Sequence, residues 1–383
     1  MKTAATPIAA ALLALAAAVL TGASTAGAAS INAGGRANAP EKPFVATAVA
    51  EFDTPWALAF LPDGRMLVTE KPGSLFLVTQ DGRKTEVDGV PDVLAKGQNG
   101  LLDIAPGPNF RSDKRVYMTY VEPSGDGGTL VLARAKLSVA GTRGMLEDLA
   151  VLWRQTPAGG GGQPGGIIAF DPEGEHLFLT VGDRMRPDSA QDPDQARGKL
   201  LRLTLDGGIP ADNPDAAAGG VRGATWTSGH RNPYGLAFAP DGRLWLDEMG
   251  PRGGDEFNLI EPGRNYGWPL VSNGDNYNGT KIPRHATRPD LAAPPLYWTP
   301  VIAPAGLAFY NGGLFPQWRG SAFIGGLAAT ALVRVTVDDA GNADEAERFD
   351  MGARIRDVAV APDGALWLIE DDDPGRLLRL TPR

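Results

Sequence analysis

Cysteine is absent from the 383 residues, and histidine occurs only three times. No disulfide can form, so the fold must be held by packing or by bound metal. Basic clusters are missing too: the formal net charge is −9, and no block of Lys and Arg offers the phosphate footprint of a nucleic-acid-binding protein. Long hydrophobic runs are absent after the first 30 residues, which predicts that no segment spans a membrane.

The start of the chain has the features of a secretory signal peptide. Lys2 is positive, an apolar stretch runs from about Ile8 to Leu20, and Ala26-Gly27-Ala28 forms a small-residue cleavage site. The apolar stretch is too short for a membrane span, and no Cys follows it to carry a lipid anchor. We therefore expect a signal peptide over 1–28, an extension over 29–45 and a periplasmic or secreted protein.

A turn-and-strand pattern recurs along the rest of the chain. The clearest copies are PDGRMLVTE (62–70), DPEGEHLFLTVGD (171–183), PDGRLWLDEMG (240–250) and PDGALWLIED (362–371), with weaker copies at 107–121 and 315–327. Each clear copy has a Pro-Asp/Glu-Gly turn followed by alternating apolar residues, which is typical of a tight turn entering a strand.

Six such units, with little helical periodicity between them, predict an all-β fold. The expected architecture is a six-bladed β-propeller of four-stranded antiparallel sheets over residues 46–383, and an array of β-sandwich sheets is the alternative. In a propeller the inner strands converge on a central channel. Loops that are far apart in the sequence would then surround one pocket.

Two segments between the repeats are richer in polar residues than a turn requires. In GHRNPYG (229–235), Arg231 and Asn232 place a guanidinium and a carboxamide on a rigid turn. The guanidinium suits an oxyanion or carboxylate ligand, although a salt bridge between blades is the alternative. In 248–269, Gly-rich backbone stands beside Asp255 and Glu256, a mixture of oxygens that Ca²⁺ accepts. The run Asp371-Asp372-Asp373 is interpreted as a solvated turn.

Taken together, these segments resemble the soluble PQQ-dependent sugar dehydrogenases, the glucose/sorbosone dehydrogenase group, which are six-bladed propellers. The resemblance runs in the family's order from about residue 54 to the C-terminus. It rests on PWALAFLPDG, GQNGLLDIAPGPNF, FDPEGEHLFLTVGD, GKLLRLTLDGGIPADNP, SGHRNPYGLAFAPDG, GPRGGDEFNLIEPGRNYGWP, APAGLAFY and RIRDVAVAPDG.

The resemblance implies a quinone site over the central channel. Gln98 would face the cofactor and substrate, and Arg231 and Asn232 would contact the reactive quinone oxygens, where a cation stabilises the charge that hydride transfer creates. Arg354 and Arg356 would grip the carboxylates of the quinone by charge-assisted pairing.

The resemblance also implies two calcium sites. The carbonyl groups of Gly250 and Pro251 match the ligands of a Ca²⁺ that bridges the quinone to the protein. Glu256 and Tyr266 match a second Ca²⁺ site, which is more structural.

Residues 159–166, GGGGQPGG, depart from the family pattern. The family has a histidine, the base that takes the sugar hydroxyl proton, where this chain has Gln163. A carboxamide can form hydrogen bonds but has no useful basicity, so His230 is considered as a substitute base. A family lysine that contacts the quinone is replaced by Ala328. The glycines are interpreted as the floor of the site, where backbone approaches a ligand closely, and not as a linker.

The leading hypothesis is an exported PQQ- and Ca²⁺-dependent oxidoreductase that oxidises aldose-type sugars at the anomeric hydroxyl, with Gln163 and Arg231 at the catalytic positions. Two alternatives stay open. One is a weakly active or inactive propeller that binds a sugar or another ligand. The other is a calcium-dependent lactonase-type hydrolase, for which Asp183, Asn232 and Glu256 are the available ligands.

Overall fold

The computed structural model describes residues 1–2, 30–125, 127–141 and 143–383, and strands dominate them. The helical segments are short: α1 (Phe110–Asp113), α2 (Gly220–Ala224) and the 3₁₀ turns η1 (Pro187–Gln191), η2 (Ala216–Ala218), η3 (His285–Thr287) and η4 (Pro316–Trp318). The all-β prediction is confirmed. The expected signal peptide, residues 1–28, lies almost wholly outside the described residues.

Two groups of four antiparallel strands share one eight-stranded sheet, in the order β3-β4-β5-β6-β10-β9-β8-β7. The groups are joined by β6 and β10, which pair in parallel. The strands are β3 (Pro55–Phe60), β4 (Met66–Glu70), β5 (Leu75–Val78), β6 (Lys84–Asp88), β7 (Leu101–Pro106), β8 (Arg115–Ser124), β9 (Gly127–Ala140) and β10 (Arg143–Arg154).

Four further sheets follow along the chain. The first contains β11 (Gly165–Phe170), β12 (His176–Val181), β13 (Lys199–Thr204) and β14 (Thr225–Ser228). The second contains β15 (Pro233–Phe238), β16 (Leu244–Glu248), β18 (Asp255–Leu259), β20 (Leu296–Trp298) and β1 (Ile31–Asn32). The third contains β21 (Pro304–Phe309), β22 (Ala322–Gly326), β23 (Ala331–Val337) and β24 (Ala343–Asp350). The fourth contains β25 (Ile355–Val360), β26 (Leu366–Glu370), β27 (Gly375–Pro382) and β2 (Phe44–Phe52). A small ribbon pairs β17 (Arg252–Gly253) with β19 (Gly274–Asp275).

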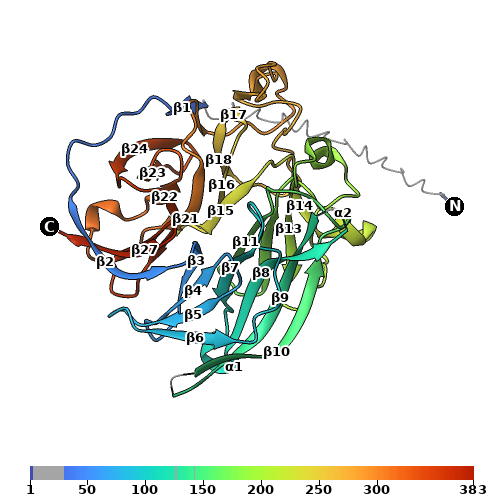
Figure 1. The fold of residues 1–383 in the computed structure, drawn as a ribbon. Coiled ribbons are helices and arrows are strands. Elements are labelled where there is room, and N and C mark those ends of the chain that lie inside the picture. Colours follow the sequence, from blue (N-terminus) through green and yellow to red (C-terminus); the bar gives the residue numbers. More distant parts are fainter. Residues whose placement is uncertain (3–29, 126, 142) are drawn as a thin grey trace.

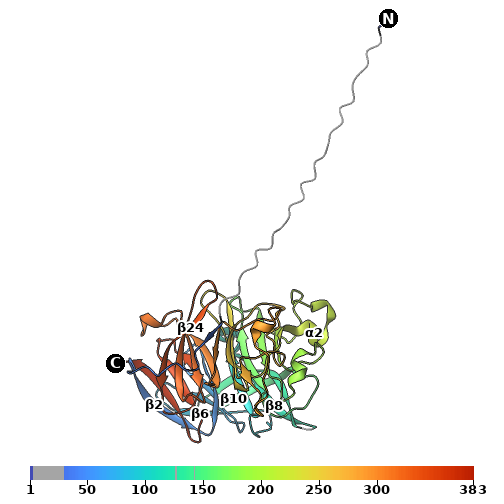
Figure 2. The ribbon, with the colours of Figure 1, turned by 90° about the horizontal axis from the view of Figure 1, so that it is seen from above.

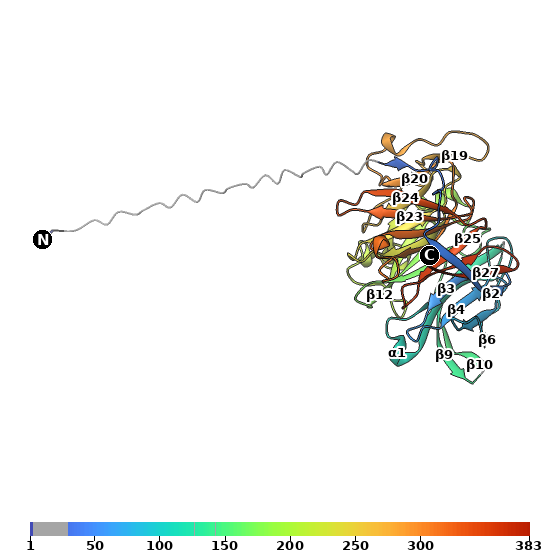
Figure 3. The same ribbon diagram turned by 90° about the vertical axis from the view of Figure 1, so that its left-hand side faces the viewer.

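The first strand of each group lies at the centre of the molecule. β3, β7, β11, β15, β21 and β25 contact one another in this order, and β25 contacts β3 again. Figure 1 shows the sheets arranged around this ring in sequence order, from blue to red. The circle is closed by β2, which pairs with the C-terminal strand β27 (Figures 1 and 3). The architecture is that of a propeller.

The turned views place the remaining elements. α2 and the C-terminus lie at opposite ends of the body in Figure 2. In Figure 3 the β9–β10 hairpin and α1 lie at the end opposite to β19. Within the described residues, no helix is long and apolar enough to cross a membrane.

The predicted turns connect the first and second strands of their groups. In the Asp-Gly turns, the glycine has a left-handed φ, +85° at Gly64 and Gly242 and +87° at Gly364, which other residues rarely adopt. The preceding Asp carboxylate accepts an N–H group two residues on, as in the pairs Asp63–Arg65, Asp241–Arg243 and Asp363–Ala365. The repeated sequence therefore marks the inner hairpin of each group.

Hydroxyl groups on the second strands tie the inner strands together. Thr69 Oγ1 accepts a hydrogen bond from Ala57 N (3.0 Å) in its own group and donates one to Leu102 O (2.7 Å) in the next. Thr119 and Thr180 donate to neighbouring inner strands in the same way, at 2.6 and 3.3 Å. These hydrogen bonds fix the geometry of the ring on which the site is built.

Candidate active site

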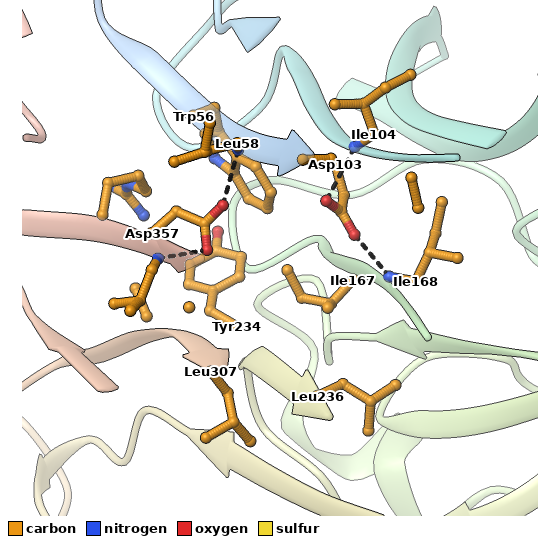
Figure 4. Close-up of a pocket in the computed structure, with 16 residues that line it drawn as sticks. Trp56, Leu58, Asp103, Ile104, Ile167, Ile168, Tyr234, Leu236, Leu307 and Asp357 are labelled. Atoms are coloured by element: carbon orange, nitrogen blue, oxygen red, sulfur yellow. Dashed lines mark hydrogen bonds between the residues drawn. The ribbon is translucent and has the colours of Figure 1, made fainter. Parts of the chain in front are cut away.

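The channel cavity is a space of about 190 Å³ at the centre of the ring, and all six inner strands line it. In Figure 4 Asp103 and Asp357 face this space from opposite sides. Each accepts two backbone hydrogen bonds, including Ile168 N to Asp103 (2.7 Å) and Leu58 N to Asp357 (2.8 Å). Burial raises the pKa of Asp103 to about 6 and that of Asp357 to about 7. These carboxylates join neighbouring inner strands and so have a structural role.

A second cavity, the mouth cavity, adjoins the first where the inner strands begin. Its volume is about 280 Å³, and it shares Trp56, Tyr234 and Arg356 with the channel cavity. Its remaining lining residues are Lys71, Gly97, Gln98, Met249, Ala303, Leu327, Arg354 and Asp371. Three predicted site residues, Gln98, Arg354 and Arg356, therefore meet at one cavity.

Both arginines of the mouth cavity share the carboxylate of Asp371. Arg354 Nε donates to Asp371 Oδ2 (2.7 Å), and Arg356 donates to Oδ1 through Nε (3.0 Å) and Nη2 (2.5 Å). Although burial opposes it, this pairing lowers the pKa of Asp371. The interpretation of 371–373 as a solvated turn is wrong for Asp371, whereas Asp372 and Asp373 are exposed.

Gln163 is buried next to this cavity and bonded on both sides. Its N–H group donates to Gln98 Oε1 (2.5 Å). Its carboxamide is oriented with the NH₂ group toward Asp183 Oδ1 and the oxygen 2.7 Å from Arg231 Nη2, because only this orientation gives both ends a partner. Burial raises the pKa of Asp183 to about 6, and the charge of Arg231 opposes the rise. A neutral amide thus bridges a carboxylate and a guanidinium.

The Arg231 side chain is held by carbonyl groups, and no carboxylate among the described residues forms an ion pair with it. Nη1 donates to Met249 O (2.9 Å) and Gly250 O (2.7 Å). Asn232 is also buried here, and its Oδ1 finds no hydrogen-bond donor within the described chain. Arg231 and Asn232 do not line the mouth cavity themselves, but both contact Met249, which does. The salt-bridge alternative for Arg231 is wrong.

The glycine segment is rigidly held. Arg184 is fully buried, and its guanidinium donates to the carbonyl groups of Gly162 (3.0 Å), Gly128 (2.7 Å) and Gly160 (3.4 Å) and to Asn99 Oδ1 (3.0 Å). A second buried guanidinium, that of Arg197, donates to the carbonyl groups of residues 157–159. This anchoring is what a structural floor requires and what a linker lacks.

Replacing Arg184 with Met should lower the free energy of unfolding by at least about 3 kcal/mol, because several buried carbonyl groups lose their donor at once. Burial lowers the pKa of Arg184 to about 10, so the guanidinium is still charged at neutral pH. Urea unfolding would measure the loss. The control is Arg83→Met, because the Arg83 side chain is 80% exposed. This substitution should change the free energy of unfolding by less than about 0.5 kcal/mol. Equal effects of the two substitutions would contradict this account.

His230 is not available as a substitute base. It is fully buried, Nδ1 lies 2.8 Å from Glu248 Oε1, and Nε2 lies 2.8 Å from Thr227 Oγ1. Its ring stacks on Tyr266, with the ring centroids 4.9 Å apart. Both nitrogen atoms are therefore committed to structural contacts, which disfavours His230 as a substitute base.

Glu256 and Tyr266 lie apart from the mouth cavity. Glu256 Oε1 is 3.2 Å from His285 Nε2, and Oε2 accepts a hydrogen bond from Asn258 (3.1 Å). The described residues contain no group of three or more His, Asp or Glu side chains that could hold a metal ion. Within the described part of the chain, Asp183 and Glu256 have no hydrogen-bond partner in common, which disfavours a lactonase site with several carboxylates around one Ca²⁺. A cation here would depend largely on backbone carbonyl groups.

Sequence reasoning missed Lys71, Arg184 and the role of Asp371. All three directly follow, or lie just after, the second strand of their group: β4 ends at Glu70, β12 at Val181 and β26 at Glu370. In an antiparallel hairpin the end of the second strand lies beside the start of the first. A charged residue just after a repeated second strand could therefore have been predicted to lie where the inner strands begin, beside the mouth cavity.

Comparison with known proteins shows the family. The family model for glucose/sorbosone dehydrogenase matches residues 52–379. The aldose sugar dehydrogenase YliI of Escherichia coli is 42% identical over 344 residues, which cover 87% of this chain and 91% of that protein.

Solved structures agree. A crystal structure of a glucose dehydrogenase has a TM-score of 0.84 at 42% identity, covering 88% of this chain and all of that one. The PQQ-bound aldose sugar dehydrogenase of Streptomyces coelicolor has a TM-score of 0.72 at 29% identity, covering 90% of this chain and all of that one. The chain therefore belongs to the glucose/sorbosone dehydrogenase family and is an aldose/glucose dehydrogenase-like enzyme.

Proposed function

We propose that this protein oxidises aldose-type sugars at the anomeric hydroxyl, using PQQ bound in the mouth cavity and Ca²⁺. The observation that carries the proposal is the set of cations, Lys71, Arg354 and Arg356, that lines a cavity above the channel. PQQ is planar and carries carboxylates, which such cations bind through charge-assisted hydrogen bonds. The PQQ-bound relative supports the choice of quinone.

The residues present fit such a cofactor. No donor among the described residues reaches the buried Asn232 Oδ1, and a polar atom in that state costs free energy unless a ligand or water satisfies it. Gln163, Arg184 and Ala303 have positive φ values of +51°, +58° and +50°. Backbone strain of this kind concentrates at binding and catalytic sites.

When bound, PQQ supplies the acceptor for the hydride that leaves the sugar carbon. The described residues would position the sugar and stabilise charge around it. Arg231 is held in place by two carbonyl groups and by Gln163, so its charge is preorganised where negative charge develops. Gln163 can orient a sugar hydroxyl but cannot remove its proton. The base position is therefore degenerate, and turnover should be slow.

The proposal includes two Ca²⁺ sites, one at Gly250 and Pro251 and one at Glu256 and Tyr266. Pro251 O and Tyr266 O accept no hydrogen bond from the described residues and are free to bind a cation, whereas Gly250 O already accepts one from Arg231. Glu256 would have to release His285 to bind Ca²⁺. Carbonyl and carboxylate oxygens of this kind are the ligands that Ca²⁺ prefers.

Adding Ca²⁺ should raise Tm, since a ligand at 100 times its Kd stabilises a fold by about 2.7 kcal/mol. Glu256→Ala should remove most of the gain. Glu261→Ala is the matched control, because the Glu261 side chain is 61% exposed and lies in the same region of the chain. Thermal melts with EDTA and with increasing Ca²⁺ would measure the response. An unchanged response in Glu256→Ala would show that Glu256 binds no calcium.

We also propose that residues 46–383 form a single six-bladed propeller with four strands in each blade. The closed ring of six inner strands and the six groups of four strands support this count. Residues 30–45 add β1 to the sheet of β20, and β2 begins at Phe44. The signal-like sequence of residues 1–28 supports export to the periplasm or the medium.

The second candidate function is a propeller that binds the quinone or a sugar without efficient turnover. Gln163 and Ala328, in place of His and Lys, favour it. Titrating the apo protein with PQQ and Ca²⁺ while recording absorbance, then adding aldoses with a redox dye, separates the two functions. A spectral shift followed by dye reduction supports the dehydrogenase. A shift without dye reduction selects the binding protein, and no shift contradicts both functions that use the quinone.

A further inference from the structure

Lys71 is fixed in position at the wall of the mouth cavity. It directly follows β4, its N–H group donates to Thr54 O (3.0 Å), and its carbonyl group accepts from Leu101 N (3.0 Å). Its side-chain stem passes over Gly100, where a Cβ atom would lie 2.5 Å from Lys71 Cγ. Lys71 lines the same cavity as Arg354 and Arg356, and its Nζ donates to the carbonyl group of Gly97, which also lines it.

The ammonium group of Lys71 is poorly satisfied by the described residues. Nζ forms one long hydrogen bond, 3.3 Å, to Gly97 O, whereas an ammonium group has three donors. No carboxylate of the described chain pairs with it. Arg354 and Arg356, by contrast, share the negative charge of Asp371. The cavity wall thus carries three cations and one carboxylate, and Lys71 is the cation whose charge is not offset.

We propose that Lys71 supplies the cofactor-binding cation that Ala328 does not. The inference rests on the proposed function, because it assigns a role toward an anionic quinone. Leu327, the neighbour of Ala328, lines the same cavity from the end of β22, and Lys71 lines it from the end of β4. The ammonium group of Lys71, at the end of β4, would therefore take the place of the lysine that the family resemblance implies at position 328, after the end of β22. Lys71 binds a carboxylate of the cofactor by exchanging its weak hydrogen bond to Gly97.

The test is equilibrium binding of PQQ to the full apo chain with Ca²⁺ present. Quenching of protein fluorescence monitors the binding, and the titration is repeated at several salt concentrations. Lys71→Met keeps the length of the stem and removes the charge. It should raise the Kd about tenfold, the size expected when a charge-assisted hydrogen bond worth about 1.4 kcal/mol is lost. Binding should also depend less on salt, because exposed charges are screened.

Three further variants make the result specific. Lys71→Arg keeps the charge and should keep most of the affinity. Lys96→Met removes an exposed lysine near Gln98 that does not line the cavity, and should leave the Kd unchanged. Lys71→Met combined with Ala328→Lys should recover affinity lost in the single variant, because a cation returns to the same cavity.

The outcomes separate this inference from the proposed function. If the wild type binds PQQ and Lys71→Met binds it equally well, Lys71 does not hold the cofactor and the inference is overturned. If the wild type does not bind PQQ, the proposed function fails and the inference fails with it. Equal loss in Lys71→Met and Lys96→Met would show a general effect of charge, which also contradicts a specific contact.

Discussion

Replacing Gln163 with His is expected to raise kcat for aldose oxidation at least about tenfold, because a positioned general base contributes 10²–10⁴-fold to such a reaction. The site is prepared for the change. The amide of Gln163 already meets Asp183, so an imidazole there would gain a carboxylate partner that orients it and favours proton uptake. Gln163 has a φ of +51°, a region in which histidine is enriched among non-glycine residues.

Dye-linked oxidation of aldoses, with PQQ and Ca²⁺ saturating, would measure the gain. The pH profile of kcat should acquire an ionisation in the range of histidine, near 6.5 in model peptides. Gln163→Asn is the control, since it keeps a carboxamide and should bring no gain. Adding Asp183→Asn to Gln163→His should remove most of the gain. If the wild type is already as fast as Gln163→His, with the same pH profile, another group is the base.

Removing the side chain of Arg231 is expected to lower kcat/KM by at least about 100-fold, the usual effect of deleting one preorganised donor at a developing charge. Arg231 contacts Gln163, Met249 and Gly250, so its deletion also loosens the wall of the mouth cavity. Arg231→Ala should therefore weaken the binding of PQQ as well as turnover. Arg231→Lys should recover little, because an ammonium group lacks the planar fork whose Nη1 meets two carbonyl groups while Nη2 meets Gln163.

Steady-state kinetics, PQQ titration and urea unfolding of the same variants would separate function from stability. Arg264→Ala is the control: its side chain is 48% exposed, and its ion pair with Glu261 is long, at 3.9 Å. The protein should stay folded in both variants. If Arg231→Ala loses several kcal/mol of stability while the binding of PQQ and kcat/KM are unchanged, Arg231 is a structural residue only.

The fold could be predicted because its signal is repeated. The Asp-Gly turns and the alternating strands after them occur at matching places in several groups, and each copy reports the same local physics of a left-handed glycine and an inner hairpin. Their outer partners were harder to predict. The pairing of β2 with β27 and of β1 with β20 joins segments far apart in the sequence, and no local pattern encodes it.

The position of a site residue could be predicted where the residue belongs to a recognisable sequence motif. It could not be predicted where it depends on a partner that is distant in the sequence. Gln98, Arg354 and Arg356 meet at one cavity as expected. His230 had to be kept as an alternative base, because its buried contacts to Glu248 and Thr227 come from folding. Asp371 was misread for the opposite reason, since an acidic run looks solvated until two arginines are placed against it. Gly160 and Gly162 depend on Arg184, which comes only after the second of the two strands that follow them, β12.

The central claim is that the residues of the mouth cavity would hold a quinone, which would supply the acceptor for hydride from a sugar. Anaerobic single-turnover absorbance tests it most directly: the apo protein is loaded with one equivalent of PQQ and with Ca²⁺, excess aldose is added without any dye, and the quinone spectrum is followed. The account predicts slow but complete reduction of the bound quinone in the wild type and faster reduction in Gln163→His. Bound quinone that stays oxidised in both proteins, with every aldose tried, would contradict it.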